Sequence, residues 1–296
     1  MRTEAVAIPA SRARAARDFF ALAKPRLNLL VVVSALVGYA MADGEPLGVL
    51  RICGLLLGTG LIAGGASALN QVLERDIDAL MRRTRTRPLP DQRLQPIDGV
   101  VFGTAITIAG ALMIIASSNL LAAAVALTTL VVYVAVYTPL KRRTTFSTVI
   151  GAIPGALPPL VGWAAASGEI TAKTWTLFGI MFLWQLPHFL AIAWMYREDY
   201  ARAGLPLLPV LEPDGRSTGR QAVVYAAALI PVSLAPAPLH MAGRLYAAGA
   251  LVLGLAFLWL TFRFASTRST RDARRAFFGS LAYLPLLWML MIADKM

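Results

Sequence analysis

The 296-residue chain is poor in the side chains that build metal centres and disulfide frameworks. It contains one cysteine, Cys53, and two histidines, His188 and His240. A single thiol forms no internal disulfide, and this composition excludes a cysteine-ligated zinc or iron–sulfur site. The sequence also lacks a P-loop, a GxSxG nucleophile elbow and a zinc-binding motif. The usual signatures of nucleotide hydrolases, serine esterases and zinc enzymes are therefore missing.

Charged residues are scarce as well. Asp, Glu, Lys and Arg make up 15 % of the chain, against about 25 % in soluble domains. Hydrophobic residues make up 57 %, and the mean hydropathy is +0.64. This composition excludes a disordered chain and argues against a water-soluble enzyme. The net charge of +12 would indicate a nucleic-acid partner in a soluble protein, but in a membrane protein it indicates basic cytoplasmic loops.

Charge-free windows indicate where the chain crosses a membrane. A spanning helix needs about 20 apolar residues. One window is about twice that length, and the polar run 117–119 inside it predicts a turn. The pattern therefore predicts an all-α, polytopic membrane protein with nine transmembrane helices. The windows cover residues 27–42, 52–73, 99–140, 144–168, 174–196, 221–243, 245–262 and 276–293.

The basic residues lie mostly on one side of these predicted helices. Counting Lys and Arg gives 24 in the N-terminal tail and alternate loops, and four on the other side: Arg51, Lys173, Arg244 and Lys295. The positive-inside rule then predicts a cytoplasmic N-terminus and a periplasmic C-terminus in a bacterial inner membrane. We divide the chain into a basic cytoplasmic tail, residues 1–26, and a nine-helix membrane domain, residues 27–296. Residues 11–23 of the tail fit either a short helix on anionic lipid or a solvated segment.

Three oxygen-bearing side chains stand at the end of the second predicted helix. Asn70, Glu74 and Asp78 are spaced by four residues, so a helix places them on one face, whereas Asp76 points nearly the opposite way. Mg²⁺ is usually bound through one or two carboxylates together with substrate phosphates. Interfacial charges that reach for water are the alternative explanation. Because Asn70 and Glu74 lie inside the end of an apolar helix, we favour a metal site.

Basic residues accompany the acidic ones. Arginine forks and lysine ammonium groups suit phosphate oxygens. A second acidic segment, residues 196–200, follows the sixth predicted helix and contains Tyr196 and Asp199 as catalytic candidates. The combination predicts a diphosphate site, whereas topology alone would explain the positive charges but not the acids beside them. The candidate diphosphate ligands are Arg83, Arg87, Lys141, Arg142 and Arg197.

The first acidic segment resembles the signature of the UbiA superfamily of membrane prenyltransferases. One departure is Gln92, near a position where glycine is common in that superfamily. The resemblance implies a helical bundle with a central cavity and a polyprenyl diphosphate donor bound with Mg²⁺. The matching pattern is Asn70-x3-Glu74-x2-Ile77-Asp78-x2-Met81-x-Arg83-Thr84-x2-Arg87.

Further stretches resemble the branch of this superfamily that farnesylates protohaem IX (haem B). They are residues 137–144, 151–163, 184–189 and 196–209. The resemblance implies transfer of farnesyl from farnesyl diphosphate to the 2-vinyl group of haem B, with addition of water, giving haem O. It also implies haem B as a substrate rather than a cofactor, the bilayer as surroundings, haem A synthase or oxidase assembly factors as partners, and no nucleic acid.

His188 is the third catalytic candidate. It follows Pro187, which frees a backbone carbonyl in the sixth predicted helix. The imidazole could accept the proton of the added water, contact the haem iron, or bond that free carbonyl. For the whole protein, two alternatives stay open: another aromatic acceptor such as 4-hydroxybenzoate, and a secondary transporter of an anionic metabolite.

Overall fold

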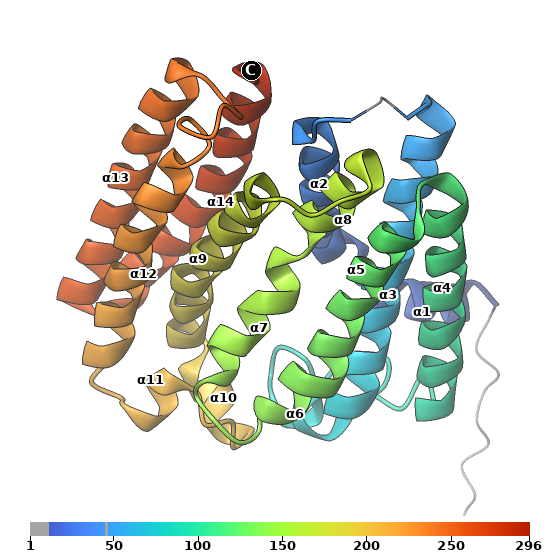
Figure 1. The fold of residues 1–296 in the computed structure, drawn as a ribbon. Coiled ribbons are helices and arrows are strands. Elements are labelled where there is room, and N and C mark those ends of the chain that lie inside the picture. The colour runs from blue at the N-terminus through green and yellow to red at the C-terminus, as the bar shows by residue number, and fades with distance from the viewer. Residues whose placement is uncertain (1–11, 45–46) are drawn as a thin grey trace, which may run out of the picture.

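The computed structural model describes residues 12–44 and 47–296, which fold almost entirely into helices (Figure 1). Within these ranges no β-strand forms, and the only bridge joins Ala242 to Lys295. The all-α prediction is confirmed. The helices are α1 (Arg12–Ala23), α2 (Pro25–Met41), α3 (Val49–Leu80), α4 (Pro96–Ser117), α5 (Leu120–Val131), the π-helix η1 (Val132–Tyr137), α6 (Thr138–Leu140), α7 (Ser147–Ala156), α8 (Pro158–Ser167), α9 (Ala172–Met195), α10 (Arg197–Arg202), α11 (Leu208–Leu211), α12 (Arg216–Leu234), α13 (Arg244–Thr267) and α14 (Thr270–Ala293).

The multi-pass character is confirmed, but the count of nine spans is too high when helices are judged by length and apolarity. In the described part of the chain seven helices are long and apolar enough to cross a membrane, or eight if the bent pair Arg14–Ala23 and Pro25–Met41 forms one span. The difference comes from two predicted spans. Helix α2 has only 17 residues, and α12 begins with the polar sequence RSTGRQ. The charge-free window at α12, residues 221–243, runs past the end of the helix at Leu234, whereas α2 reaches the length of a span only together with α1.

Two breaks interrupt the long helices, and the first, at residues 117–119, was predicted from the sequence. Helix α4 ends at Ser117 and α5 begins at Leu120, with the Asn119 side chain accepting the N–H of Ala122 at 2.9 Å. The fifth predicted span, rich in glycine and proline, divides into α7 and α8 at Leu157, with Pro154 inside α7. Proline removes a helical hydrogen bond, so these positions bend the span as expected.

Glycines bring α3 against α4. A Cβ atom at Gly58 would lie 2.7 Å from the carbonyl oxygen of Gly110, and one at Gly65 would lie 2.6 Å from that of Gly103. Only hydrogen fits at such backbone contacts, which is typical of close helix packing in membranes. Gly60 has more room, since its Cβ would meet only Val32 at 3.4 Å. Gly58 and Gly65 therefore let α4 approach α3 to backbone contact.

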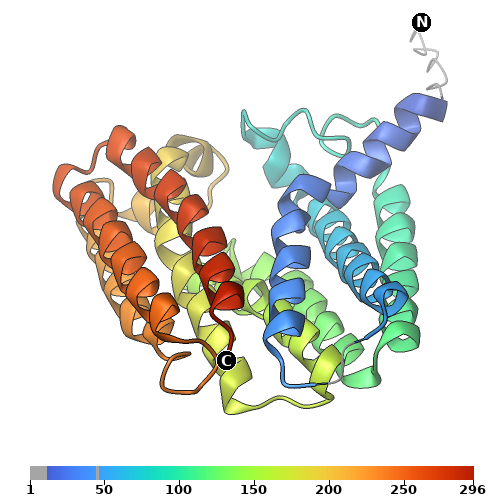
Figure 2. The same ribbon diagram turned by 90° about the horizontal axis from the view of Figure 1, so that it is seen from above.

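The core connects the beginning of the chain with its end. Val37 and Met41 of α2 share a buried cluster with Leu287 and Trp288 of α14. Figure 2 shows these two helices next to each other, between two groups of helices. The Lys295 ammonium group adds a bond to the carbonyl oxygen of Ala40 at 2.8 Å. These contacts close the bundle around its middle.

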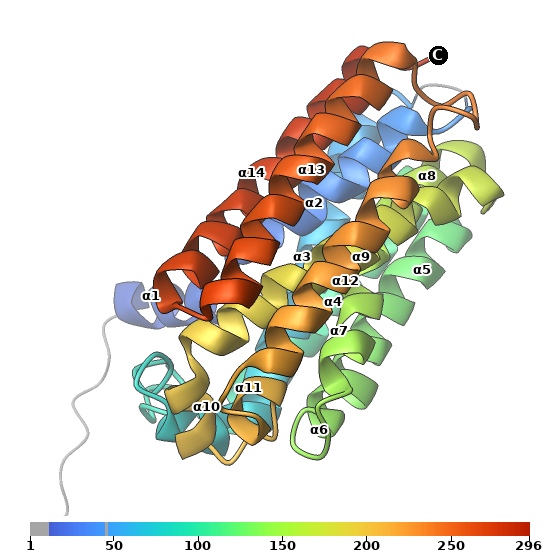
Figure 3. The ribbon, with the colours of Figure 1, turned by 90° about the vertical axis from the view of Figure 1, so that its left-hand side faces the viewer.

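Helix α1 lies at the end of the bundle that also holds α6, α10 and α11 (Figure 3). Its Leu22 is buried against Ala68 and Leu89, and its Asp18 pairs with Arg93. The helical alternative for residues 11–23 is thus confirmed from Arg12 onward, while its contact with lipid stays a prediction. The first part of the predicted tail, residues 1–11, lies outside the described residues.

Candidate active site

The C-terminal half of α3 places three oxygen-bearing side chains on its buried face. Asn70 is 2 %, Glu74 4 % and Asp78 1 % exposed, whereas the side chain of Asp76 is 77 % exposed and pairs with Arg75. This difference follows from the helical period, because residues four apart share a face and residues two apart do not. The predicted geometry of the three side chains is confirmed.

The chain after α5 brings a lysine to this face. The Lys141 ammonium group, at the end of α6, donates to Glu74 Oε1 at 2.9 Å and to Oε2 at 3.2 Å. Burial disfavours the charged ammonium group, but the neighbouring Tyr137 and the Glu74 carboxylate together outweigh burial, and the pKa of Lys141 lies above its ordinary value. A charged pair therefore forms where the sequence predicted a metal ligand next to a phosphate ligand.

The π-helix η1 prepares this contact. In η1 the rings of Tyr133 and Tyr137 stack with their centroids 5.4 Å apart. Thr138 donates to the carbonyl oxygen of Tyr133 at 2.8 Å and accepts from the Asn70 side-chain nitrogen at 2.9 Å. A π-turn in a longer helix often marks a functional site. Here it orients the Asn70 amide so that its oxygen remains available.

The loop after α3 folds back over Asp78. Arg87 Nη1 donates to Asp78 Oδ2 at 2.6 Å, and the Thr84 hydroxyl donates to the carbonyl oxygen of Asp78 at 2.8 Å. Two carboxylates of one helical face are thus each held by a cation from a different segment. Lys24, in a left-handed conformation at the α1–α2 junction, lies within electrostatic range of both pairs.

The second acidic segment is arranged differently. Asp199 is buried and pairs with Arg202 of its own helix, while Tyr196 lies under Arg83, whose Cζ is 5.2 Å from the ring centroid. Two predicted diphosphate ligands have other contacts. Arg142 donates to the carbonyl oxygen of Leu73, and Arg197 donates to that of Trp194 and stacks on its ring. The structure thus joins Arg87 and Lys141 to the acids of α3, and gives Arg142 and Arg197 backbone partners.

His188 lies in an aromatic environment on α9. Its ring stacks on Trp184 at 5.2 Å and packs against Phe277 at 4.9 Å, measured between ring centroids. Its Nδ1 lies 2.7 Å from Ser280 Oγ. Ser280 donates its own proton to the carbonyl oxygen of Phe277 at 2.6 Å, so Nδ1 must donate to Ser280. This arrangement leaves the lone pair on Nε2.

A cavity of about 100 Å³ lies beside Lys141, with walls that include Tyr137, Phe189 and Tyr200. It lies between Lys141 and α9, the helix that carries His188. Among residues 12–44 and 47–296, no group of three or more His, Cys, Asp or Glu side chains could hold a metal. A divalent ion would need the Asn70 amide oxygen, the two carboxylates and oxygens of a phosphate ligand. This donor set fits Mg²⁺, which is usually bound in this way.

Sequence reasoning missed three contributors. Lys24 was counted only as a topology signal, although the proline that follows it restricts the backbone conformation of Lys24. Thr138 lies in the basic 137–144 stretch, and Ser280 lies 92 residues from His188. No local pattern marks Ser280, because its role depends on how α9 and α14 pack.

Comparison with known proteins places the chain. The UbiA prenyltransferase family matches residues 31–286. Curated relatives named protoheme IX farnesyltransferase include those of Solibacter usitatus, 49 % identical and covering 94 % of this chain and 99 % of the relative, and Koribacter versatilis, 44 % identical and covering 94 % and 93 %. The chain belongs to the UbiA prenyltransferase family. Within that family it groups with the protoheme IX farnesyltransferases.

Solved structures share the fold at low identity. A digeranylgeranylglyceryl phosphate synthase aligns with a TM-score of 0.78 at 14 % identity, over 94 % of this chain and 98 % of that one. A UbiA homolog from Archaeoglobus fulgidus, bound to GPP and Mg²⁺, aligns with a TM-score of 0.65 at 14 % identity, over 93 % and 99 %. These likenesses confirm the all-α UbiA-type bundle.

The buried Lys141–Glu74 pair yields a prediction for stability. Lys141→Met leaves a buried carboxylate without a partner, so it should lower the free energy of unfolding by about 3 kcal/mol. Adding Glu74→Gln to that variant should recover more than half of the loss. Thermal unfolding of the purified protein in detergent measures both effects. Lys173→Met is the control, because Lys173 pairs with Asp43 in an exposed position and should change stability by less than about 1 kcal/mol. Equal losses in both lysine variants would contradict the prediction.

Proposed function

We propose that the chain transfers a farnesyl group from farnesyl diphosphate to the 2-vinyl group of haem B, with addition of water, to give haem O and diphosphate. The observation that carries the proposal is 41–49 % identity, over most of the chain, to relatives named protoheme IX farnesyltransferase. The buried charges at the end of α3 support it, because they suit a phosphate-bearing substrate at the edge of an apolar bundle.

Diphosphate binding would exchange partners within the site. We propose that Asn70, Glu74 and Asp78 hold Mg²⁺, which when bound neutralises part of the charge on the departing diphosphate. Lys141 and Arg87, released from the two carboxylates, would then donate to phosphate oxygens. Arg83 and Lys24 are near enough to contribute further positive charge. This exchange is possible because Glu74 and Asp78 are each already paired with a cation that could bind a phosphate oxygen instead.

The reaction breaks the bond between farnesyl C1 and the diphosphate oxygen, and both electrons leave with diphosphate. The vinyl group of haem B supplies the electrons of the new carbon–carbon bond. Water adds to the resulting cation next to the pyrrole and loses one proton. The stacked rings of Tyr133 and Tyr137 offer aromatic faces to the allylic cation next to Lys141. Asp199 and Tyr196, in the second acidic segment, remain candidate catalytic residues.

His188 is assigned to the haem in this proposal. The bond from Nδ1 to Ser280 leaves the Nε2 lone pair for haem iron or for the proton of the added water. Ser280 acts as a positioning residue, since it fixes the tautomer without meeting a substrate. The Trp184 and Phe277 rings pack on the imidazole and hold its plane in one orientation.

A single assay tests the proposed reaction. Purified protein in lipid should release diphosphate from radiolabelled farnesyl diphosphate and place the label on haem B only when haem B is added. The same mixture with 4-hydroxybenzoate tests the other acceptor class. A labelled aromatic product without labelled haem would contradict the proposal, and transport of intact substrate into vesicles would indicate a transporter.

The metal ligands make a second prediction. Glu74→Gln and Asp78→Asn should each lower turnover by about two orders of magnitude or more, the scale of losing one strong electrostatic stabiliser. Asp76→Asn is the matched control, because its carboxylate lies one half-turn away and is exposed. The turnover assay should be repeated over a Mg²⁺ titration, where the two buried variants should need more metal. Equal tolerance of all three substitutions would remove the metal proposal.

His188 and Ser280 make a third prediction. His188→Ala should weaken haem B binding, followed by the Soret band, while binding of a non-reactive farnesyl diphosphate analogue stays nearly unchanged. Ser280→Ala keeps the imidazole but removes the hydrogen bond that fixes its tautomer. It should weaken haem binding by about tenfold, the lower end of the effect of removing a hydrogen-bond partner from a metal ligand. Wild-type haem affinity in His188→Ala would refute the assignment. Parallel loss of both ligands would indicate a structural role.

The location in the cell is the finer part of the proposal. We propose an inner-membrane protein with a cytoplasmic N-terminus, because the alternating loops predicted from the sequence place 24 of 28 Lys and Arg residues on that side. A periplasm-active reporter fused after Met296 should be active, and the same reporter inserted after Asp91 should be silent. Activity at both positions or at Asp91 alone would overturn this orientation.

A further inference from the structure

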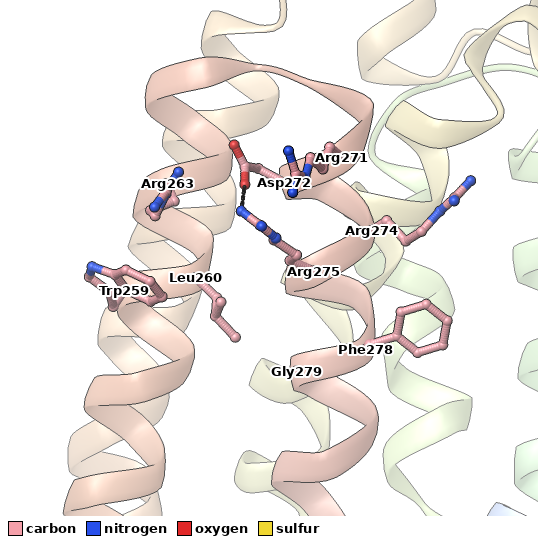
Figure 4. A pocket seen from close by; sticks show the side chains of 9 residues that line it. All are labelled: Trp259, Leu260, Arg263, Arg271, Asp272, Arg274, Arg275, Phe278 and Gly279. Atoms are coloured by element: carbon pink, nitrogen blue, oxygen red, sulfur yellow. Dashed lines mark hydrogen bonds and ion pairs between the residues drawn. The ribbon is translucent and has the colours of Figure 1, made fainter.

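A groove of about 560 Å³ separates α13 from α14 outside the candidate active site (Figure 4). It lies where α13 ends and α14 begins, at the end of the bundle that holds α6 and α10. The side chain of Leu260 occupies its floor, because Gly279 on the facing helix carries none. Its charged and aromatic lining consists of Trp259, Arg263, Arg271, Arg274, Arg275 and Phe278, together with Asp272.

The groove carries an excess of positive charge. Four arginines line it and Asp272 is the one acid. That carboxylate already accepts three hydrogen bonds, from Arg275 Nη1 at 3.0 Å, from the Thr267 hydroxyl at 2.8 Å and from the Ser269 hydroxyl at 3.1 Å. Within residues 12–44 and 47–296, neither Arg271 nor Arg274 has an ion-pair partner. The groove therefore offers guanidinium groups that no acid of its own neutralises.

Two of these cations are held in position. Asp272 orients Arg275, and the Trp259 ring supports Arg263, whose Cζ is 5.5 Å from the ring centroid. In Figure 4, Arg275 and Leu260 extend into the space between the two helices, while Arg274 and Phe278 lie on the other side of α14. Charges needed only for membrane topology require no such support.

The apolar part of the groove lies next to the charged part. Trp259 is 57 % and Phe278 59 % exposed, although both belong to helices that qualify as membrane spans. Leu255 and Val252 continue the exposed stripe of Trp259 one and two turns further along α13. Arginine with tryptophan at the end of a span is typical of the headgroup level. The groove thus places arginines at the headgroup level and exposed apolar side chains deeper in the membrane. A phospholipid has its phosphate and its acyl chains in the same order.

We propose that this groove binds one anionic phospholipid, with its phosphate on Arg263, Arg271 and Arg275 and its acyl chains along Trp259 and Leu260. Charge complementarity and depth in the membrane carry the assignment. The site is separate from the proposed diphosphate site, and its existence does not depend on the proposed reaction.

Native mass spectrometry of the detergent-purified protein tests the proposal. Phosphatidylglycerol and phosphatidylcholine with the same acyl chains are titrated separately. Phosphatidylglycerol should bind at least tenfold more tightly, and R263Q/R271Q should lose that preference while the Arg275–Asp272 pair stays intact. R216Q/R220Q removes the same charge from exposed positions at the same end of the bundle, and should change the affinity less than twofold.

Three outcomes would overturn the proposal. The first is an equal loss of phosphatidylglycerol affinity in both double variants, which would indicate a diffuse charge effect. The second is equal affinity for phosphatidylglycerol and phosphatidylcholine. The third is displacement of phosphatidylglycerol by millimolar inorganic phosphate, which would indicate a site for free phosphate. If thermal unfolding shows that R263Q/R271Q is destabilised, R271Q alone replaces it, because Arg271 is exposed and unpaired in the described residues. R271Q should weaken phosphatidylglycerol binding at least threefold, and unchanged affinity would overturn the proposal.

Discussion

The structure depends on two carboxylates that are buried inside an apolar bundle and paired with cations. Glu74 and Asp78 are buried on one face of α3, and an isolated buried charge is strongly unfavourable. Each is therefore paired with a cation brought by a separate segment, Lys141 from the end of α6 and Arg87 from the loop after α3. These pairs fix where both segments lie, and through Thr138 and Thr84 they also fix the backbone around the site.

Sequence periodicity was sufficient for the parts of the site that lie on one helix. The four-residue spacing of Asn70, Glu74 and Asp78 predicted their shared face, and the position of Asp76 predicted its exposure. It was not sufficient for the contacts between segments. Arg142 and Lys141 are neighbours in the sequence, but only Lys141 reaches Glu74, because the end of α6 turns the Arg142 side chain to the Leu73 carbonyl oxygen.

The membrane spans show a similar limit. Windows without charged residues located the apolar part of every long helix, but they measured where charge is absent rather than how long the apolar helix is. Helix α12 shows the difference, because its polar first turns leave too short an apolar stretch. The contact between His188 and Ser280 was beyond sequence reasoning for another reason. It joins two helices whose packing is set by Trp184, which donates to the carbonyl oxygen of Ser280 at 2.8 Å.

Paired charges also explain how an apolar bundle can hold two carboxylates and two cations close together. Without substrate, the cations Lys141 and Arg87 balance the carboxylates Glu74 and Asp78, so neither sign is left uncompensated. On the proposed function, a metal–diphosphate ligand brings both signs at once, so carboxylates and cations exchange partners without either becoming isolated. A carboxylate-only site would have to bind metal before it could be buried, and an arginine-only site would lack compensation in the free enzyme. Pairing each carboxylate of α3 with a cation from another segment avoids an uncompensated buried charge of either sign. This accounts for the occurrence of acidic and basic residues together in the sequence.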